Sequence, residues 1–548
     1  MGKSQVTGQE NKQQDKMVEG SIWLSAGNLI SRLLGAVYII PWYAWMGENS
    51  NAANGLFAMG YNIYALFLLI STAGIPGAVA KQTAHYNSLN EYKVSRQLFV
   101  KALQAMAVLG VICAGLMYLA APLLARLSGG GTDLIPVMRS LSIALLVFPC
   151  MSVVRGFFQG NNQMAPFAIS QIFEQVARVF YMLLTAFIIM KVQSGNYVDA
   201  VVQGTFAAFI GLLASCAVLI WYLVKERPAF QNLERTQGTE KIKIHSKDLL
   251  LETVRQAVPF IIITSGIQIF KLIDQGTFSK IMSTTTNYSQ KQLVELFSLF
   301  SANPDKLTMI IIALGTSVIG AGLPLITASY TLRDKRELAK IISNNLQLFL
   351  FIMLPSVMGM MVLAKPLYSL FYAPDKLGTS ILAWSAVQAL LLGFYMVAAN
   401  MLQGMYQNRI ALKYLGIGIL VKLLFQYPVV RLFEVYGPIL STYLGLGVSC
   451  FLMIRRVHQV THFSKKKVGK RALLLFLMSV IMTIGAIITR SLLYLVLSPE
   501  RKVTAFIIIL FVAAVGGAIY GFLGLKTRIA DRLLGSRVAG LRSKFHIK

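Results

Sequence analysis

Fourteen apolar runs, each long enough to cross a lipid bilayer as a helix, dominate this 548-residue sequence. A helix needs about 20 consecutive apolar residues to span the hydrocarbon core of a bilayer. Hydrophobic residues make up 56% of the chain and charged residues only 13%, so we expect an all-α polytopic membrane protein. The predicted spans lie at 21–46, 55–80, 98–125, 136–158, 165–190, 199–224, 252–282, 306–330, 343–365, 378–402, 412–432, 438–456, 471–494 and 503–525.

The basic residues indicate the orientation of these spans. The chain carries 51 Lys and Arg against 22 Asp and Glu, a net charge of +29. Most of the basic residues lie in alternate connections, which are cytoplasmic if the N-terminus is cytoplasmic, whereas opposite connections such as "GENSNAAN" and "SPERK" hold few. The positive-inside rule then predicts that both termini lie in the cytoplasm. No segment is long enough for a soluble basic domain, so we expect no nucleic-acid partner.

The chain also contains an internal repeat. The stretch "GIPGAVAKQTAHYNSLNEYK" at residue 74 is similar to "GLPLITASYTLRDKRELAK" at residue 322, and "GFFQGNNQMAP" at 156 is similar to "NMLQGMYQNRI" at 400. A six-helix unit has an even number of spans, so its two copies share one orientation, which is typical of transporters. The predicted parts are a cytoplasmic N-terminus (1–20), an N-lobe (21–225), a solvated basic linker (226–250), a C-lobe (251–456), two extra helices (457–525) and a basic cytoplasmic tail (526–548).

Polar residues follow one face of the first helix of each copy. Helical spacing places Arg32 on the same face as other small or polar residues, namely Ser21, Ser25, Asn28 and Gly35. The first helix of the second copy has a similar stripe, made of Thr264, Gln268, Lys271 and Gln275. Arg32 aligns with Lys271 between the copies, so each half presents one cation at a matching depth.

The fifth helix of each copy carries a second pair of aligned cations, Arg178 and Lys422. Glu174 lies one turn before Arg178 and could pair with it, and Asp274 lies three residues after Lys271. A cation at the bilayer centre costs roughly 2.5–3.5 kcal/mol on insertion scales, so it should face a cavity or a partner. Two interpretations stay open: internal pairs that hold helices together, or a cationic cavity that takes an anion such as a phosphate or diphosphate.

Nearly the whole chain beyond residue 17 resembles a known transporter superfamily. The opening "GSIWLSAGNLISRLLG", the "STAGIPGAVAKQ" segment, the fourteen spans and the two six-helix copies resemble the polysaccharide-transport branch of the multidrug/oligosaccharidyl-lipid/polysaccharide exporters. Within that branch the chain is similar to the Gram-positive lipid II flippases, with the stage V sporulation protein B close by. The resemblance implies a MATE-like fold in the bacterial cytoplasmic membrane and a part in peptidoglycan synthesis.

The resemblance also implies a role for particular residues. The family's "SR-x-L-G" segment matches Ser31, Arg32, Leu34 and Gly35, and its arginine is implied to line a central cavity and meet the lipid diphosphate. A basic residue that starts the family's eighth helix matches Lys306. The two extra helices are implied to form a groove for the polyprenyl tail.

The sequence departs from Gram-negative relatives at other basic positions. They have a basic–acidic pair where this chain has Val37, Tyr38 and Ile39, and basic residues in the second helix where this chain reads "YNIYALFLLI". The anion site is therefore expected to use Lys271, Arg178 and Lys422 beside Arg32 and Lys306, with Asn28, Ser25, Gln268, Gln275, Asp274 and Glu174 as polar or ion partners.

Three functions compete for this pattern. The first is a flippase for an anionic polyprenyl-diphosphate glycolipid, either lipid II or another undecaprenyl-linked polysaccharide. The second is a cation-coupled drug exporter, for which Asp274 is the best-placed acid. The third is an enzyme, a membrane glycosyl polymerase, but the outer loop 283–305 offers only Glu295 and Asp305 as carboxylates.

We predict the flippase, a transporter and not an enzyme. No Walker loop is present, and His458 and His462 lie in a basic loop without a third ligand. We therefore expect no cofactor and no bound metal, and leave Na⁺ or H⁺ coupling open. The expected partners are the glycolipid, membrane lipids and proteins of cell-wall synthesis.

Overall fold

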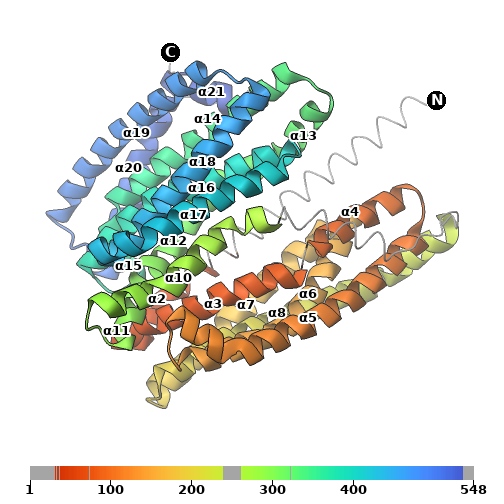
Figure 1. Ribbon diagram of the computed structural model, residues 1–548, viewed down its shortest axis with the longest axis horizontal. Helices are drawn as coiled ribbons and strands as arrows, with labels where there is room; N and C mark the ends of the chain where they lie inside the picture. The colour runs from red at the N-terminus through yellow and green to blue at the C-terminus, as the bar shows by residue number, and fades with distance from the viewer. Residues whose placement is uncertain are drawn as a thin grey trace. The chain divides into compact units, whose positions relative to one another are not determined.

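The computed structural model describes residues 31, 34–35, 37–72, 74–237, 261–320 and 322–534. This described part is helical and contains no strand (Figure 1). Its α-helices are α2 (Ile39–Met46), α3 (Ser50–Thr72), α4 (Ile75–Ser88), α5 (Tyr92–Ser128), α6 (Leu134–Gly160), α7 (Met164–Phe187), α8 (Tyr197–Gln237), α10 (Gly266–Thr285), α11 (Gln290–Phe297), α12 (Asn303–Gly320), α13 (Leu323–Thr331), α14 (Lys335–Val362), α15 (Ala364–Phe371), α16 (Lys376–Gly404), α17 (Asn408–Phe433), α18 (Gly437–Thr461), α19 (Lys465–Tyr494), α20 (Lys502–Lys526) and α21 (Ile529–Leu534). Single 3₁₀ turns lie at Gly47–Asn49 and Glu434–Tyr436, and single π-helical turns at Ile188–Val192 and Ser298–Ala302.

The predicted spans appear as helices wherever the structure describes them; residues 21–30 of the first span and 252–260 of the seventh lie outside the described residues. Ten helical stretches are long and apolar enough to cross a membrane, judged by length and composition. Two of them contain more than one predicted span: Ile39–Ser88 includes α2, α3 and α4, and Asn408–Thr461 includes α17 and α18. The runs predicted at 252–282 and 306–330 correspond to α10 and α12. The predicted all-α, polytopic fold is therefore confirmed.

Two predicted spans are each broken into two helices. The run 55–80 is divided between α3 and α4, and the run 306–330 between α12 and α13. Pro76 and Pro324 stand in the first turn of the second helix in each case. Proline lacks the N–H that would continue the preceding helix and is tolerated at a helix start. The shared break supports the internal repeat. Pro355, by contrast, lies inside α14.

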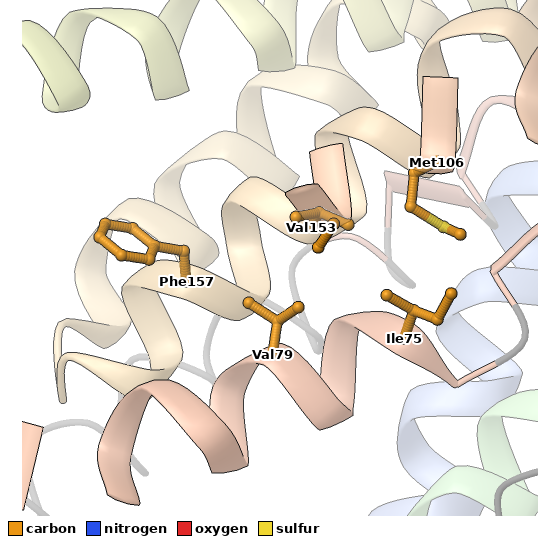
Figure 2. Packing of buried hydrophobic residues seen from close by; sticks show 6 residues of the cluster. Ile75, Val79, Met106, Val153 and Phe157 are labelled. Carbon is orange, nitrogen blue, oxygen red and sulfur yellow. The ribbon is translucent and has the colours of Figure 1, made fainter. Parts of the chain in front are cut away.

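The chain divides into two compact units, Met1–Gln268 and Ile269–Lys548. In the first unit, α3, α5, α6 and α8 pack along one another, and α7 packs on α8 (Figure 1). At one end of this unit, α4 lies on α5 and α6 through a core of small and medium apolar side chains (Figure 2). The buried members of this core are Ile75, Val79, Ala102, Met106, Val153 and Phe157.

In the second unit, α12, α14, α16 and α18 pack together, and α17 lies along α18. The two extra helices, α19 and α20, pack on each other and reach the unit through α14 and α15 (Figure 1). Two apolar clusters hold them there, one around Val362 and Val512 and one around Met478 and Tyr520.

Two predicted loops contain helix. The linker predicted as a solvated loop from residue 226 continues α8 as far as Gln237. Phe230 on this extension packs edge-on against Phe157, and Glu234 pairs with Arg96 at 3.2 Å, contacts that the linker's composition did not reveal. The outer loop 283–305 contains α11, which begins with a capping box between Ser289 and Gln292.

Candidate functional site

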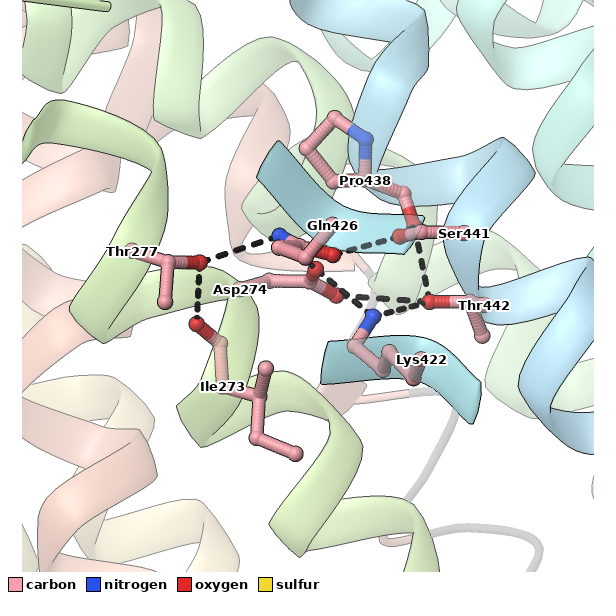
Figure 3. A network of polar contacts seen from close by, with 8 residues as sticks. All are labelled: Ile273, Asp274, Thr277, Lys422, Gln426, Pro438, Ser441 and Thr442. Carbon is pink, nitrogen blue, oxygen red and sulfur yellow. Dashed lines mark hydrogen bonds and ion pairs between the residues drawn. The ribbon is translucent and has the colours of Figure 1, made fainter. Parts of the chain in front are cut away.

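A buried polar network surrounds Lys422 in the second unit (Figure 3). Lys422 on α17 is 0% exposed, and its Nζ donates to Asp274 Oδ1 on α10 at 2.7 Å and to the Thr442 hydroxyl on α18. Gln426, one turn further along α17, donates to the same carboxylate oxygen at 3.0 Å. The Ser441 hydroxyl in turn donates to the side-chain amide oxygen of Gln426. The network ties three helices together and satisfies both charges, as a buried ion pair requires.

This pairing corrects the expectation for Lys422. The side chain was predicted to line an anion cavity, but its charge is neutralised by Asp274 and shielded from solvent. Its ammonium also lies 5.4 Å from the centroid of the Phe270 ring. The internal-pair interpretation therefore fits Lys422 and Asp274 better than the cavity interpretation.

A second buried network in the first unit is built around Glu174 on α7. Its Oε2 accepts from Arg155 Nη2 on α6 at 2.8 Å, and its Oε1 accepts from Arg178 Nη2 at 2.8 Å. Arg155 also donates to Ser170 and Ser215. The predicted pairing of Glu174 with Arg178 one turn away is thus confirmed.

One carboxylate and two guanidinium groups leave this first network with a net charge of +1. Arg178 Nη1 donates to the Tyr61 hydroxyl at 3.0 Å, while its Nε has no hydrogen-bond partner among the described residues. The Arg178 side chain is 21% exposed, compared with 10% for Arg155. Arg178 is therefore the more exposed of the two cations in this cluster.

The two repeats neutralise their aligned cations in different ways. The acid paired with Arg178 lies on the same helix, whereas the acid paired with Lys422 lies on another helix. Glu174 precedes Arg178 by four residues, and the residue four before Lys422 is Gly418. A Cβ atom at Gly418 would lie 1.8 Å from Ser449 Oγ, so the close approach of α18 excludes a glutamate there. Asp274 follows Lys271 by three residues, and the residue three after Arg32 is Gly35. Each repeat thus has a carboxylate where the other has a glycine.

Lys271 has a different partner from the one expected. Its Nζ donates to Asp305 Oδ1 on α12 at 2.6 Å, because Asp274 is taken by Lys422. The side chains of Lys271 and Asp305 are 18% and 33% exposed, so this pair lies closer to solvent than the Lys422 pair. Lys306 follows Asp305 at the start of α12 and is half-buried.

The remaining predicted residues are distributed as follows. Gln268 donates to the backbone carbonyl of Asn62 at 2.7 Å, and Gln275 is 1% exposed on α10. Arg32, Asn28 and Ser25 lie outside the described residues. The structure therefore gathers Glu174 with Arg178, and Asp274 with Lys422, but in separate units.

Sequence reasoning missed Arg155, Asp305 and the hydroxyl and amide partners of Lys422. Arg155 lies inside the predicted span 136–158 without an acid one turn away, and such a cation should face a cavity or a partner. Asp305 was assigned to an outer loop, although it belongs to the first turn of α12. Within the described residues no group of three or more His, Cys, Asp or Glu side chains could hold a metal ion.

Comparison with known proteins agrees with this architecture. Residues 17–330 match the family model described as "Polysaccharide biosynthesis protein". Lipid II flippase MurJ of Bacillus subtilis (strain 168) is 35% identical over 545 residues, which cover 96% of this chain and 98% of the relative.

Solved structures show the same fold. A lipid II flippase MurJ in an inward closed conformation matches with a TM-score of 0.63 at 15% identity, over 94% of this chain and 99% of that chain. An inward-facing multidrug resistance MATE transporter of the MOP superfamily matches with a TM-score of 0.61 at 15% identity, over 79% and 96% of the two chains. The chain therefore belongs to the polysaccharide biosynthesis protein family and to the family of lipid II flippase MurJ.

Proposed function

We propose that this protein is a lipid II flippase, a transporter that moves the polyprenyl-diphosphate-linked cell-wall precursor from the inner to the outer leaflet for peptidoglycan synthesis. The observation that carries this proposal is the 35% identity to MurJ over nearly the full length of both chains. The surplus positive charge at Arg178 supports an anionic substrate, because guanidinium groups bind phosphates through two parallel hydrogen bonds.

The acids in the described helices fit this function better than export of a cationic drug. Glu174 and Asp274 are buried, and each already accepts hydrogen bonds from a cation of its own unit. A cationic drug would need to displace one of those partners. Asp305 is likewise paired, with Lys271.

We assign the anion site to Arg178, Lys271, Lys306 and Arg32. Lys422 contributes to structure instead. The two extra helices, α19 and α20, supply the surface for the polyprenyl tail. Transport proceeds by alternating access, and an inside-negative potential favours outward movement of an anion by about 2.3 kcal/mol per charge per 100 mV. The site of action is the bacterial cytoplasmic membrane, and cell-wall synthesis proteins are the protein partners that this function implies.

Complementation tests the function, and Arg178→Ala tests the site. In a bacterium depleted of its own lipid II flippase, the parent protein should restore growth and Arg178→Ala should not. The variant keeps Glu174 neutralised by Arg155, so its melting temperature should stay close to that of the parent. Binding of lipid II to the purified variant should weaken at least about tenfold, since a hydrogen bond to a charged group contributes about 1.5–3 kcal/mol.

The control for this experiment is Arg126→Ala, which removes an exposed arginine at the end of α5. It should complement and bind as the parent does. Normal lipid II binding by a well-folded Arg178→Ala protein would remove Arg178 from the site. Failure of the parent to restore growth, with restored export of another undecaprenyl-linked polysaccharide in a matching strain, would reassign the substrate.

Both termini are proposed to be cytoplasmic, and single cysteines in a cysteine-free background test this. Asn196→Cys and Ser289→Cys should react with an impermeant thiol reagent added to intact cells. Ser88→Cys and Lys466→Cys should react only after the membrane is opened. All four positions are exposed, so access within the protein does not limit labelling. The reverse pattern would contradict the orientation.

A further inference from the structure

A cavity of about 280 Å³ lies at the end of the first unit where α4, α5, α6 and α8 meet. One face of α8 and one face of α5 line it. On α8 the lining residues are spaced at helical intervals, namely Leu223, Arg227, Phe230, Gln231 and Glu234. On α5 they are Tyr92, Ser95, Arg96 and Phe99. Asn87 and Asn161 close a third side and hydrogen-bond to each other at 2.8 Å.

The length of α8 leads us to expect the cavity beyond the membrane interface. At about 1.5 Å per residue, the 41-residue α8 is about 60 Å long, twice the thickness of a hydrocarbon core of about 30 Å. Trp221 and Tyr222 are aromatic residues of the kind that mark a membrane interface, and Lys225 lies over the Trp221 ring. Arg227 to Glu234 follow them along the helix, on the side proposed to be cytoplasmic. The corresponding helix of the second repeat, α18, has 25 residues.

The floor of the cavity is aromatic and fixed in place. The Phe99 and Phe157 rings lie 4.5 Å apart between centroids, and Phe230 meets Phe157 edge-on at 5.5 Å. Phe157 belongs to the buried core beneath α4 (Figure 2). A planar or apolar group can stack on this floor without any rearrangement of the core.

The walls present polar groups that no described residue satisfies. Ser95 is 3% exposed, and its hydroxyl has no hydrogen-bond partner in the described part of the chain. Within that same part, Arg227 has no acidic partner and the Gln231 amide accepts and donates no hydrogen bond. Arg96, by contrast, is paired with Glu234. The cavity therefore combines the guanidinium of Arg227, an exposed residue, with the Ser95 hydroxyl, the Gln231 amide and an aromatic floor.

We propose that this cavity is a binding site for a phosphate ester, with the phosphate on Arg227 and the organic part on the Phe99–Phe157–Phe230 floor. Arginine matches the charge and geometry of a phosphate, and Ser95 and Gln231 supply further hydrogen bonds. Two sources share this chemistry: a soluble nucleotide and the headgroup of an anionic phospholipid. The site is separate from the Glu174 network and does not depend on the transported substrate.

Binding to the full-length protein in phosphatidylcholine nanodiscs tests the proposal. One arm measures adenosine and uridine monophosphate by equilibrium dialysis, with inorganic phosphate as the comparison. The other arm measures a short-chain phosphatidylglycerol. Saturable binding is expected in one arm, and it should be tighter than that of inorganic phosphate because the floor contributes. A soluble ligand identifies a nucleotide site, and the lipid alone identifies a headgroup site.

Variants locate the binding in the cavity. Arg227→Gln should weaken it at least tenfold, and Phe230→Leu should weaken it while leaving the binding of inorganic phosphate unchanged. The control is Arg235→Gln, which removes an exposed arginine of the same helix that does not line the cavity. Absence of saturable binding in both arms, or equal binding by Arg227→Gln and Arg235→Gln, would overturn the proposal. Neither result bears on lipid II transport, which complementation tests separately.

Discussion

Lys422→Met is expected to lower the free energy of unfolding by about 3–5 kcal/mol, because it leaves the Asp274 carboxylate buried without its cation. The loss should be visible as a lower melting temperature and a lower yield of the purified protein. Gln426 and Thr442 still donate to or contact Asp274, but neutral donors do not replace the ammonium charge. Thermal unfolding followed by tryptophan fluorescence in detergent measures the effect.

The double variant Lys422→Met/Asp274→Leu serves as its control. It removes both charges from the network, so it should recover most of the lost stability. If the double variant is as unstable as the single one, the pair contributes through packing and not through charge compensation. If Lys422→Met alone is as stable as the parent, the contact between α10 and α17 is not the one that holds these helices together.

Glu174→Gln is expected to be equally disruptive in the first unit. The change removes the only carboxylate bound to Arg155 and Arg178 in the described structure, and leaves two guanidinium groups in a buried site. We expect a loss of about 3–5 kcal/mol of stability and no complementation. The measurement is the same thermal unfolding, together with the level of protein in the membrane.

Comparison with Arg178→Ala separates folding from function. That variant also breaks a contact with Glu174, but it lowers the charge of the cluster from +1 to zero and should fold. A second control is Glu174→Gln/Arg155→Gln, which returns the net charge to +1 and should recover part of the stability. Equal melting temperatures for Glu174→Gln and the parent would show that the cluster tolerates two adjacent cations. Charge balance would then not be what stabilises it.

The helices could be predicted from the sequence because hydropathy is a local property of the chain. The Glu174–Arg178 pair could be predicted for the same reason, since four residues form one helical turn. The partner of Lys422 could not, because Asp274 lies 148 residues from Lys422 in the sequence but only three from Lys271. Only the packing of α10 on α17 decides between the two lysines.

The breaks and extensions of helices were harder to predict than the spans. Pro76 and Pro324 could have been read as helix starts, since each follows a glycine by two residues. The extension of α8 depends on contacts with α5 and α6, and its charged composition resembles that of a solvated loop. For the same reason the cavity beside it leaves no pattern in the linear sequence.

The distance along the chain between Asp274 and Lys422 has a consequence for biosynthesis. A ribosome that adds about 5–20 residues per second needs about 7–30 s to make the 148 residues that separate them. During that time α10 is in the translocon or the bilayer with an acid whose insertion costs about 2.5–3.5 kcal/mol. Lys271 on the same helix gains Asp305 after 34 residues, much earlier. Each new copy therefore passes through a stage in which the Asp274 carboxylate lacks its final partner, until α17 is made.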